Sequence, residues 1–301
     1  MTPIPCRRTD DSRFAVLPGY PWAPHYVDSL PALGGMRLHY VDEGPHEAPV
    51  TWLCLHGNPT WSYVYRRMIP VFLAAGHRVV APDMPGFGRS DKPVDVGQHT
   101  FGWHRQVLLE FVRRLDLQRI NLVVQDWGGL LGLTLPPVEP ARYRGLLVMN
   151  TILATAEAPL SEGFVQWRDM CRNRPDFGIG RLLLRGNPHL SEQECAAYDA
   201  PFPDPGHRAA TGAFPEMVPD TPEADGVAES REAARFWAEA WSGRTMMAVG
   251  TQDPVFSPAV MEALRRKIRN CPPAMPVAEA GHFVQEHGER IAAEALRHLG
   301  T

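Results

Sequence analysis

The sequence lacks the features that mark several large classes of protein. No stretch approaches the roughly 18 consecutive apolar residues that a membrane-spanning helix needs, and there is no internal repeat or low-complexity tract. The formal net charge is only −4 and the basic residues are scattered, which argues against nucleic acid and an anionic membrane surface as partners. What remains is a chain of 301 residues with 44% apolar content, enough for one large domain or for a domain with an insertion. We expect its substrate to be small and uncharged.

The cysteines form no pattern that would indicate disulfides or a metal site. They are odd in number and include neither a CxxC pair nor a spacing typical of metal ligands. Arg7 and Arg8 near the N-terminus are not followed by the apolar stretch of a secretion signal. We therefore expect a soluble cytoplasmic protein that needs no metal or organic cofactor, and a monomer, because nothing in the sequence requires assembly. The five cysteines are Cys6, Cys54, Cys171, Cys195 and Cys271.

Segments with strand character alternate with segments of helical character along most of the chain. Apolar residues recur at helical spacing in 62–75, 104–115 and 258–268. Such alternation is typical of an α/β fold with a mostly parallel, doubly wound sheet. The segments expected to form strands are 36–41, 50–55, 79–82, 120–124, 146–150, 246–250 and 274–278.

The alternation stops in residues 155–230, which predicts an inserted helical cap. This region lacks apolar β-branched runs and is rich in proline, aspartate, arginine and aromatic residues. Phe164, Trp167 and Phe214 would need burial, which favours a folded lid over a linker. The chain is therefore expected to have three parts: a first part of the core in 1–154, the cap in 155–230, and a second part of the core in 231–301.

The most informative motif is Val-Val-Gln-Asp-Trp-Gly-Gly at 123–129. It overlaps the apolar stretch 120–124 and opens a segment with helical spacing, so Asp126 is expected at a sharp turn between a strand and a helix. Strand ends in open α/β sheets are where ligands and catalytic groups gather. A second interpretation is that Asp126 only caps the helix, because aspartate is favoured where helices begin.

A carboxylate nucleophile at this turn would suit attack on an alkyl carbon. A serine that displaced a leaving group from saturated carbon would end as an ether, which water does not readily cleave. An aspartate would end as an ester, whose carbonyl can be hydrolysed to regenerate the enzyme. Asp126 therefore indicates displacement at sp³ carbon, and the mechanism then needs a base to activate water and an acid to orient that base.

Candidates for the acid and the base follow two later strands. Asp253 comes after 246–250 and His282 comes after 274–278, in the chain order known for hydrolytic triads on open α/β sheets. Each residue alone is ordinary, since Asp before Pro often starts a turn and Gly-His is a common loop pair. Their joint placement after two successive strands favours a catalytic interpretation.

Two further loops follow predicted strands. A backbone N–H from the loop 55–61, with that of Trp127, would form an oxyanion hole for ester hydrolysis; the alternative is an ordinary turn built by Gly, Asn and Pro. His56 in this loop is interpreted as structural rather than as a metal ligand. The loop 82–90 lacks the lysine of a P-loop and the GxGxxG spacing, so it is also interpreted as structural.

Five motifs together resemble those of the haloalkane dehalogenases of the α/β-hydrolase superfamily, over nearly the whole chain. Gln-Asp-Trp-Gly-Gly at 125–129 is specific by itself, and the others are specific jointly. The resemblance implies an α/β-hydrolase fold with a helical cap, hydrolysis of haloalkanes to alcohol, halide and proton, and a role in detoxification. The motifs lie at 56–61, 82–90, 123–129, 163–167 and 280–286.

The resemblance implies a catalytic triad of Asp126, Asp253 and His282. A related branch of the family places its acid after the preceding strand, but here 146–150 and Thr151 offer no carboxylate, which favours Asp253. The expected reaction has two stages. Asp126 is alkylated first, and water activated by His282 then hydrolyses the ester.

The resemblance also implies a site for the departing halide between two N–H donors. Trp127 is the first, and the second is either a lid tryptophan or the asparagine of the His-Gly-Asn loop. We prefer Trp167, because indole groups donate without carrying a charge that would trap the halide. Whether Asn58 adds a third contact stays open at this point. Plain packing in the lid is the alternative for Trp167.

The remaining expected roles are placed by motif alignment. The backbone N–H groups of Asn58 and Trp127 are expected to form the oxyanion hole. The substrate is expected to be a small apolar halogenated molecule in a pocket whose wall residues could equally belong to the core. These wall residues are Phe164, Leu130, Pro215, Val218, Val255 and Phe256.

Three alternative functions stay open at this point. An epoxide hydrolase would share the nucleophile and the histidine but would use lid tyrosines as acids, and Tyr198 is the one tyrosine in the cap. A haloacid dehalogenase of the fluoroacetate type would need arginines for a carboxylate, for which Arg168, Arg172 and Arg174 are candidates. A non-catalytic ligand-binding protein of the same fold is the most distant alternative, because it has no reason to keep all three triad residues.

Overall fold

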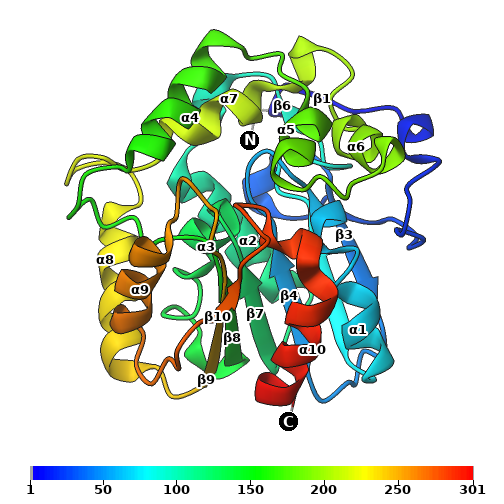
Figure 1. The fold of residues 1–301 in the computed structure, drawn as a ribbon. Coiled ribbons are helices and arrows are strands. Elements are labelled where there is room, and N and C mark those ends of the chain that lie inside the picture. The colour runs from blue at the N-terminus through cyan, green and yellow to red at the C-terminus, as the bar shows by residue number, and fades with distance from the viewer. Residues whose placement is uncertain (1–2, 301) are drawn as a thin grey trace.

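An eight-stranded sheet forms the centre of the molecule in the computed structural model, which describes residues 3–300 (Figure 1). The six strands from β10 to β5 in spatial order run parallel to one another. At the edge beyond β5, β3 pairs antiparallel to β5 and β2 pairs antiparallel to β3. The strands in spatial order are β10 (Met275–Val277), β9 (Arg244–Gly250), β8 (Tyr143–Met149), β7 (Ile120–Val124), β4 (Thr51–Leu55), β5 (Arg78–Pro82), β3 (Leu38–Glu43) and β2 (His25–Val27).

Helices flank the sheet (Figure 1). The pair α1 and α10 contact each other, as do α2 and α3, and α9 lies against β9. Each of these helices connects or follows strands of the sheet, as crossover connections between parallel strands require. They are α1 (Ile69–Ala74), α2 (Phe101–Arg114), α3 (Trp127–Gly132), α8 (Val227–Arg235), α9 (Pro258–Lys267) and α10 (Gly288–Leu299).

Four further helices form a layer over one end of the sheet, at the top of Figure 1. Polar side chains cap two of them, since Ser161 and Ser191 accept hydrogen bonds from backbone N–H groups of the first turns of α4 and α6. The layer lies between β8 and β9 in the chain, where the sequence predicts an insertion. Its helices are α4 (Glu162–Asn173), α5 (Ile179–Gly186), α6 (Glu192–Asp199) and α7 (Ala209–Glu216).

The fold class expected from the sequence is confirmed, with differences in detail. The strand 120–124 is found as predicted, and the other predicted strands are shifted by one to three residues at their ends. The helix predicted at 62–75 is instead a 3-10 turn at Ser62–Tyr65 followed by α1, which starts with Pro70 in its first turn. Residue 230, the expected end of the cap, lies inside α8 (Figure 1).

The elements that the sequence did not predict are short and mostly polar or exposed. They are the edge strand β2, the two-stranded sheet of β1 (Cys6–Arg7) and β6 (Lys92–Pro93), and the 3-10 helices. The exception is α10, the one long core helix of the described chain that the sequence expectations did not include. None of the helices in residues 3–300 is both long and apolar enough to cross a membrane. The remaining 3-10 turns lie at Asp11–Phe14, Pro31–Leu33, Val96–Gln98, Pro140–Arg142, Pro205–His207 and Val284–His287, and a π-helical turn lies at Phe236–Ala240.

Candidate active site

Asp126 lies at the turn between β7 and α3 with an unusual backbone conformation. Its φ is 50° and its ψ is −126°, a region that costs a non-glycine residue on the order of 1–3 kcal/mol. Gly128 allows this turn, because a Cβ there would lie 1.9 Å from the carbonyl oxygen of Leu55. The side chain of Asp126 makes no capping hydrogen bond to α3. The simple cap interpretation therefore does not account for the carboxylate.

The imidazole of His282 lies between two carboxylates. Its Nδ1 is 2.9 Å from Asp253 Oδ2, and its Nε2 is 3.5 Å from Asp126 Oδ2. Asp253 follows β9 and His282 follows β10, which are adjacent strands, while Asp126 follows β7. The structure thus brings the three residues of the expected triad together at the carboxyl ends of the parallel strands.

The two carboxylates determine the charge of the histidine. Burial alone would lower the pKa of His282, but Asp253 and Asp126 raise it to about 10. Burial would likewise raise the pKa of Asp253, but His282 and the backbone N–H groups of Val255 and Phe256 lower it below its ordinary value. With Asp126 in its carboxylate form, His282 is therefore an imidazolium at neutral pH.

The acid Asp253 is held by groups that fix its orientation. Its Oδ1 accepts a hydrogen bond from Val255 N–H at 2.8 Å, and its Oδ2 accepts one from Asn150 Nδ2 at 3.0 Å. Asn150 also donates to the carbonyls of Gly250 and Phe256. Asn150 was not among the predicted site residues, although a polar residue ending the buried strand predicted at 146–150 was a signal for such a role.

The loop after β4 contacts Asp126, the candidate nucleophile, from the other side. The backbone N–H of Asn58 donates to Asp126 Oδ1 at 2.7 Å, in the manner expected of one arm of an oxyanion hole. A Cβ on Gly57 would lie 2.3 Å from the same oxygen, so only glycine fits there. The side chain of Asn58 is buried, and neither its Oδ1 nor its Nδ2 has a partner among the described residues.

Most tryptophans donate their indole N–H to an acceptor within the protein, but Trp127 and Trp167, the expected halide ligands, do not. Five of the eight donate to a protein acceptor, for example Trp103 to the carbonyl of Ala32 at 2.8 Å. Trp127, Trp167 and Trp22 have no such bond in the part of the chain that the structure describes. Trp127 is buried, which makes its unused donor the most informative of the three.

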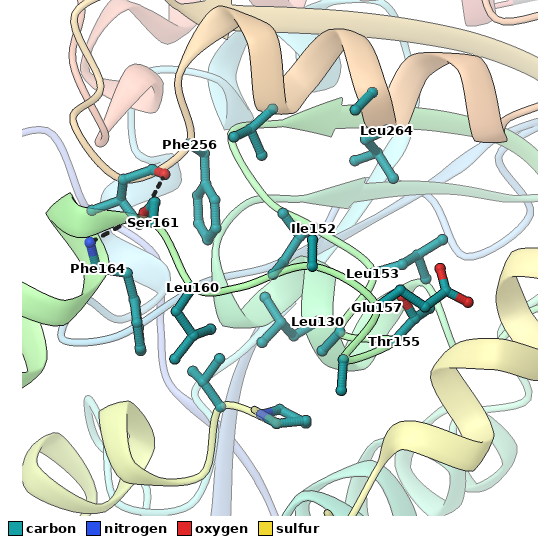
Figure 2. A pocket seen from close by; sticks show the side chains of 18 of the residues that line it. Leu130, Ile152, Leu153, Thr155, Glu157, Leu160, Ser161, Phe164, Phe256 and Leu264 are labelled. Atoms are coloured by element: carbon teal, nitrogen blue, oxygen red, sulfur yellow. Dashed lines mark hydrogen bonds between the residues drawn. The ribbon is translucent and has the colours of Figure 1, made fainter. Parts of the chain in front are cut away.

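A cavity of about 450 Å³ opens beside Asp126 and Trp127 (Figure 2). Five of the six expected wall residues line it: Leu130, Phe164, Val218, Val255 and Phe256. Pro215 does not line it, because it is buried inside α7, and Pro219 lines it instead. Trp167 is not among the lining residues either. Its ring packs edge-on against Phe177 with the centroids 5.5 Å apart.

One wall of the cavity was not predicted. The segment 152–161, between β8 and α4, contributes ten consecutive lining residues, where the sequence suggested only the start of the cap. Figure 2 shows Ile152, Leu153 and Leu160 of this segment beside the cavity, across from Phe256 and Leu264. Its mixture of alanine, proline and small polar residues gives no periodic signal, which is why the wall was missed.

A chain of buried amides behind the site was also missed. Gln125 Nε2 donates to the carbonyl of His282 at 3.0 Å, and Gln285 Nε2 donates to Gln125 Oε1 at 3.1 Å. Both side chains are fully buried. The amides therefore connect the strand end that carries the nucleophile with the loop that carries the histidine.

The residues required by the alternative functions are engaged elsewhere. Tyr198 donates to Glu286 and to no group near Asp126, so it is not placed as the acid of an epoxide hydrolase. Arg168 pairs with Asp220, and Arg172 pairs with Glu216. Arg174 is exposed, and none of the three arginines lines the cavity.

Comparison with known proteins places this geometry in a family. Residues 52–289 match the family model described as alpha/beta hydrolase fold. The chain is 41% identical to a haloalkane dehalogenase of Psychrobacter cryohalolentis, over 95% of both chains, and 39% identical to one of Mycobacterium marinum, over 96% of this chain and 97% of the relative. It also resembles the structure of haloalkane dehalogenase DpaA from Paraglaciecola agarilytica NO2, with a TM-score of 0.96, 44% identity and 98% of both chains covered.

Proposed function

The chain belongs to the haloalkane dehalogenases of the α/β-hydrolase fold, and from this membership we propose the roles of its individual residues. It is an enzyme that hydrolyses haloalkanes to an alcohol, a halide ion and a proton. The observation that carries the proposed roles is the placement of His282 between the carboxylates of Asp126 and Asp253.

The first step is alkylation of Asp126. Because Oδ1 is held by the N–H of Asn58, the free oxygen Oδ2 attacks the carbon that bears the halogen. A bond forms between Oδ2 and this carbon, and the carbon–halogen bond breaks with both electrons leaving on the halide. Displacement at carbon needs an in-line approach, which the cavity beside Asp126 and Trp127 accommodates.

The departing halide is stabilised by hydrogen-bond donors. The unused indole N–H of Trp127 is the first, and we assign the second to Trp167 with the buried side-chain amide of Asn58 as a third contact. A neutral donor of this kind strengthens as charge develops on the halogen and still allows the ion to leave. Trp167 reaches this position only if its indole edge turns toward the cavity that Phe164 of the same helix lines.

The second step is hydrolysis of the ester. Esterification removes the charge of Asp126 and with it one of the two groups that raise the pKa of His282. The imidazolium then releases its proton to solvent, and Nε2 takes a proton from water, whose oxygen attacks Cγ of Asp126. The oxyanion is held by the N–H groups of Asn58 and Trp127. Collapse expels the alkoxide, which takes the proton back from His282. The carboxyl proton of Asp126 then passes to the neutral imidazole, which restores both the carboxylate nucleophile and the imidazolium.

The domain boundaries, cellular location and oligomeric state of the enzyme are also part of the proposal. We assign residues 1–154 to the first part of the core, 155–226 to the cap and 227–301 to the second part of the core, because the expected cap end at residue 230 lies inside α8. We further propose a cytoplasmic monomer that removes small halogenated alkanes, in contrast to the relative from Paraglaciecola agarilytica, whose structure is described as tetrameric. The scheme uses side chains, two backbone N–H groups and water.

The nucleophile assignment is tested by an Asp126→Ala variant. Bromide and proton release from bromoethane should fall to the uncatalysed rate, because Asp126 is the one aspartate among the described residues that line the cavity. The exposed Asp28 provides a matched control, and Asp28→Ala should retain wild-type turnover. Bromide release by Asp126→Ala at the wild-type rate would remove Asp126 from the mechanism. Turnover of styrene oxide but not of bromoethane by the parent protein would favour an epoxide hydrolase.

A further inference from the structure

The cavity extends away from Asp126 between two walls. One wall is a face of α9 formed by Val260, Ala263, Leu264 and Lys267, which recur at the three- and four-residue spacing of one helix side. The other wall is the segment 152–161. Most of these side chains are apolar, so the space between the walls suits a hydrocarbon chain.

Helix α9 gives this extension its length and direction. The helix begins directly after Phe256, whose ring lies 5.6 Å from that of His282, and it ends at Lys267. Ten helical residues span about 15 Å. Lys267 therefore lies far from the reacting carbon, at the opposite end of the same wall.

The segment 152–161 runs out along the helix and returns. Before its first residue, Thr151 Oγ1 donates to the carbonyl of Asp126 at 2.7 Å, and at its last residue Ser161 Oγ donates to the carbonyl of Val255 at 3.0 Å. Both ends are thus fixed near the site, and the middle of the segment is the part that reaches outward. In Figure 2, Ser161 and Phe164 lie on one side of the cavity, and Thr155 and Glu157 lie on the other.

One ion pair joins the two walls at the outer end. Glu157 Oε2 lies 3.1 Å from Lys267 Nζ, and both residues line the cavity. Lys267 and Thr155 lower the pKa of Glu157, and Arg231, which donates to the carbonyl of Thr155, adds to this effect. Glu157 is therefore charged at neutral pH. About half of each side chain is exposed, so the pair is weak enough to open and polar enough to stop an apolar chain.

We propose that the Glu157–Lys267 pair closes the outer end of a substrate channel and sets how long a linear 1-haloalkane the enzyme accepts. The proposal rests on the proposed function, since it takes the halogen-bearing carbon to lie at Asp126. The alkyl tail then extends along α9 toward Lys267. The substrate class of this chain is thus linear primary haloalkanes whose tails are shorter than the passage.

The proposal predicts a definite dependence on chain length. Each methylene buried between the apolar walls should raise kcat/KM by about fourfold, which is the burial energy of one methylene expressed as a rate ratio. The gain should stop once the tail meets the charged pair. Removing the pair should let the gain continue for longer chains, whereas short chains that never reach it should be unaffected.

The experiment measures bromide release from bromoethane, 1-bromobutane, 1-bromohexane, 1-bromooctane and 1-bromodecane. The variants are Lys267→Ala, the double variant Glu157→Ala with Lys267→Ala, and the charge exchange Glu157→Lys with Lys267→Glu. Arg266→Ala is the matched control, because Arg266 is the preceding residue on α9, pairs with Glu262 and does not line the cavity.

In the wild type and in Arg266→Ala, kcat/KM should rise with chain length and then level off. In Lys267→Ala and the double alanine variant it should rise further for the longest bromoalkanes, by at least about fourfold over the wild type, and the charge exchange should restore the levelling. An unchanged chain-length profile in both alanine variants would overturn the proposal. Bromoethane is too short to reach the ion pair, so its turnover reports on Asp126 alone. Absence of bromoethane turnover in the wild type would therefore indicate failure of the proposed function and not of the channel proposal.

Discussion

Two side chains at the site have hydrogen-bonding groups that no other described residue pairs with. Asn58 has a buried side-chain amide whose two polar atoms have no partner among the described residues. The indole N–H of Trp127 makes no hydrogen bond to a described residue. An unsatisfied buried polar group costs on the order of 1–3 kcal/mol. In the proposed function a halide ion would accept hydrogen bonds from both groups, which gives them a partner that the rest of the protein does not provide.

Removal of single indole N–H groups tests this assignment. Trp127→Phe should lower kcat by a factor on the order of 10²–10³, the usual loss for one donor to a developing anion, and Trp167→Phe should lower it by a smaller factor. Trp103→Phe is the control, because the indole of Trp103 is already bound to Ala32. Bromide release and quenching of tryptophan fluorescence by bromide both report on the variants. Wild-type bromide affinity in Trp167→Phe would assign Trp167 to packing against Phe177.

The charge of His282 depends on Asp126, and this dependence can be measured. An Asp126→Asn variant is neutral at the same position, as the ester is, so the pKa of His282 should fall below the value of about 10 that the two carboxylates produce. The sign follows because losing a nearby negative charge destabilises the imidazolium. NMR titration of the imidazole gives the pKa, with Asp28→Asn as the control. An unchanged pKa of His282 in Asp126→Asn would contradict the proposed step in which His282 loses its proton once Asp126 is esterified.

The site residues that directly follow a strand could be predicted from the sequence, because their place in the chain determines where they lie in the fold. Asp126, Asp253 and His282 each follow a strand of a parallel sheet, and such strand ends meet at one edge, so the sequence was enough to bring them together. Asn150 and Gln125 were missed because their roles depend on hydrogen bonds to the backbone of distant loops. The polar residue at the end of a buried strand was a local signal for Asn150, but no local pattern encodes which distant groups Asn150 and Gln125 bind.

At the scale of elements, two strand ends are linked by buried amides. Gln125 at the end of β7 bonds the carbonyl of His282 after β10, and Gln285 supports Gln125. Strands β7 and β10 are not neighbours in the sheet. These side chains therefore provide a direct connection between the nucleophile and the base.

Loss of this connection should affect the second chemical step. Gln125→Leu removes the bond to His282, so hydrolysis of the ester should slow about tenfold, an effect of the size of one lost buried hydrogen bond, while alkylation continues. Alkyl-enzyme should then accumulate in intact-mass spectra with bromoethane. Asn121→Leu is a matched control, because Asn121 is a buried amide on the same strand that bonds only the carbonyl of Leu299. Equal accumulation in both variants, or in neither, would contradict a positioning role for Gln125.

The elements themselves were predicted unevenly. The strand 120–124 is buried along its whole length, and its apolar β-branched run was enough to locate it. The edge strand β2 has only three residues and is partly exposed, so its sequence carries no apolar run. The 3-10 turn before α1 depends on packing of the tyrosines of Ser62–Tyr65, which are buried, and periodicity alone could not separate it from the helix.

At the scale of the whole molecule, the cap and the core together make the cavity. The core supplies Asp126, Trp127 and the face of α9, while Phe164 comes from α4 and Val218 follows α7. Substrate size therefore depends on how these parts meet, which composition and motif spacing do not encode. The segment 152–161 joins the core to the cap, so changes there should alter selectivity before they alter the chemistry.

The state of assembly is a prediction at the same scale. All residues of the proposed site come from one chain, so a monomer of 33.5 kDa is expected to be active. Sedimentation equilibrium at several concentrations gives the mass, and bromide release should be proportional to enzyme concentration over the same range. A stable tetramer mass would instead place this chain with the relative described as tetrameric.

The alkylated carboxylate is tested most directly by trapping it. In a His282→Gln variant, alkylation can proceed but the water that cleaves the ester loses its base. After incubation with bromoethane, intact-mass spectrometry should show the protein heavier by one ethyl group in place of a hydrogen, and peptide mapping should locate the group on Asp126. Continued bromide release without any adduct, or an ethyl group on another residue, would contradict the account.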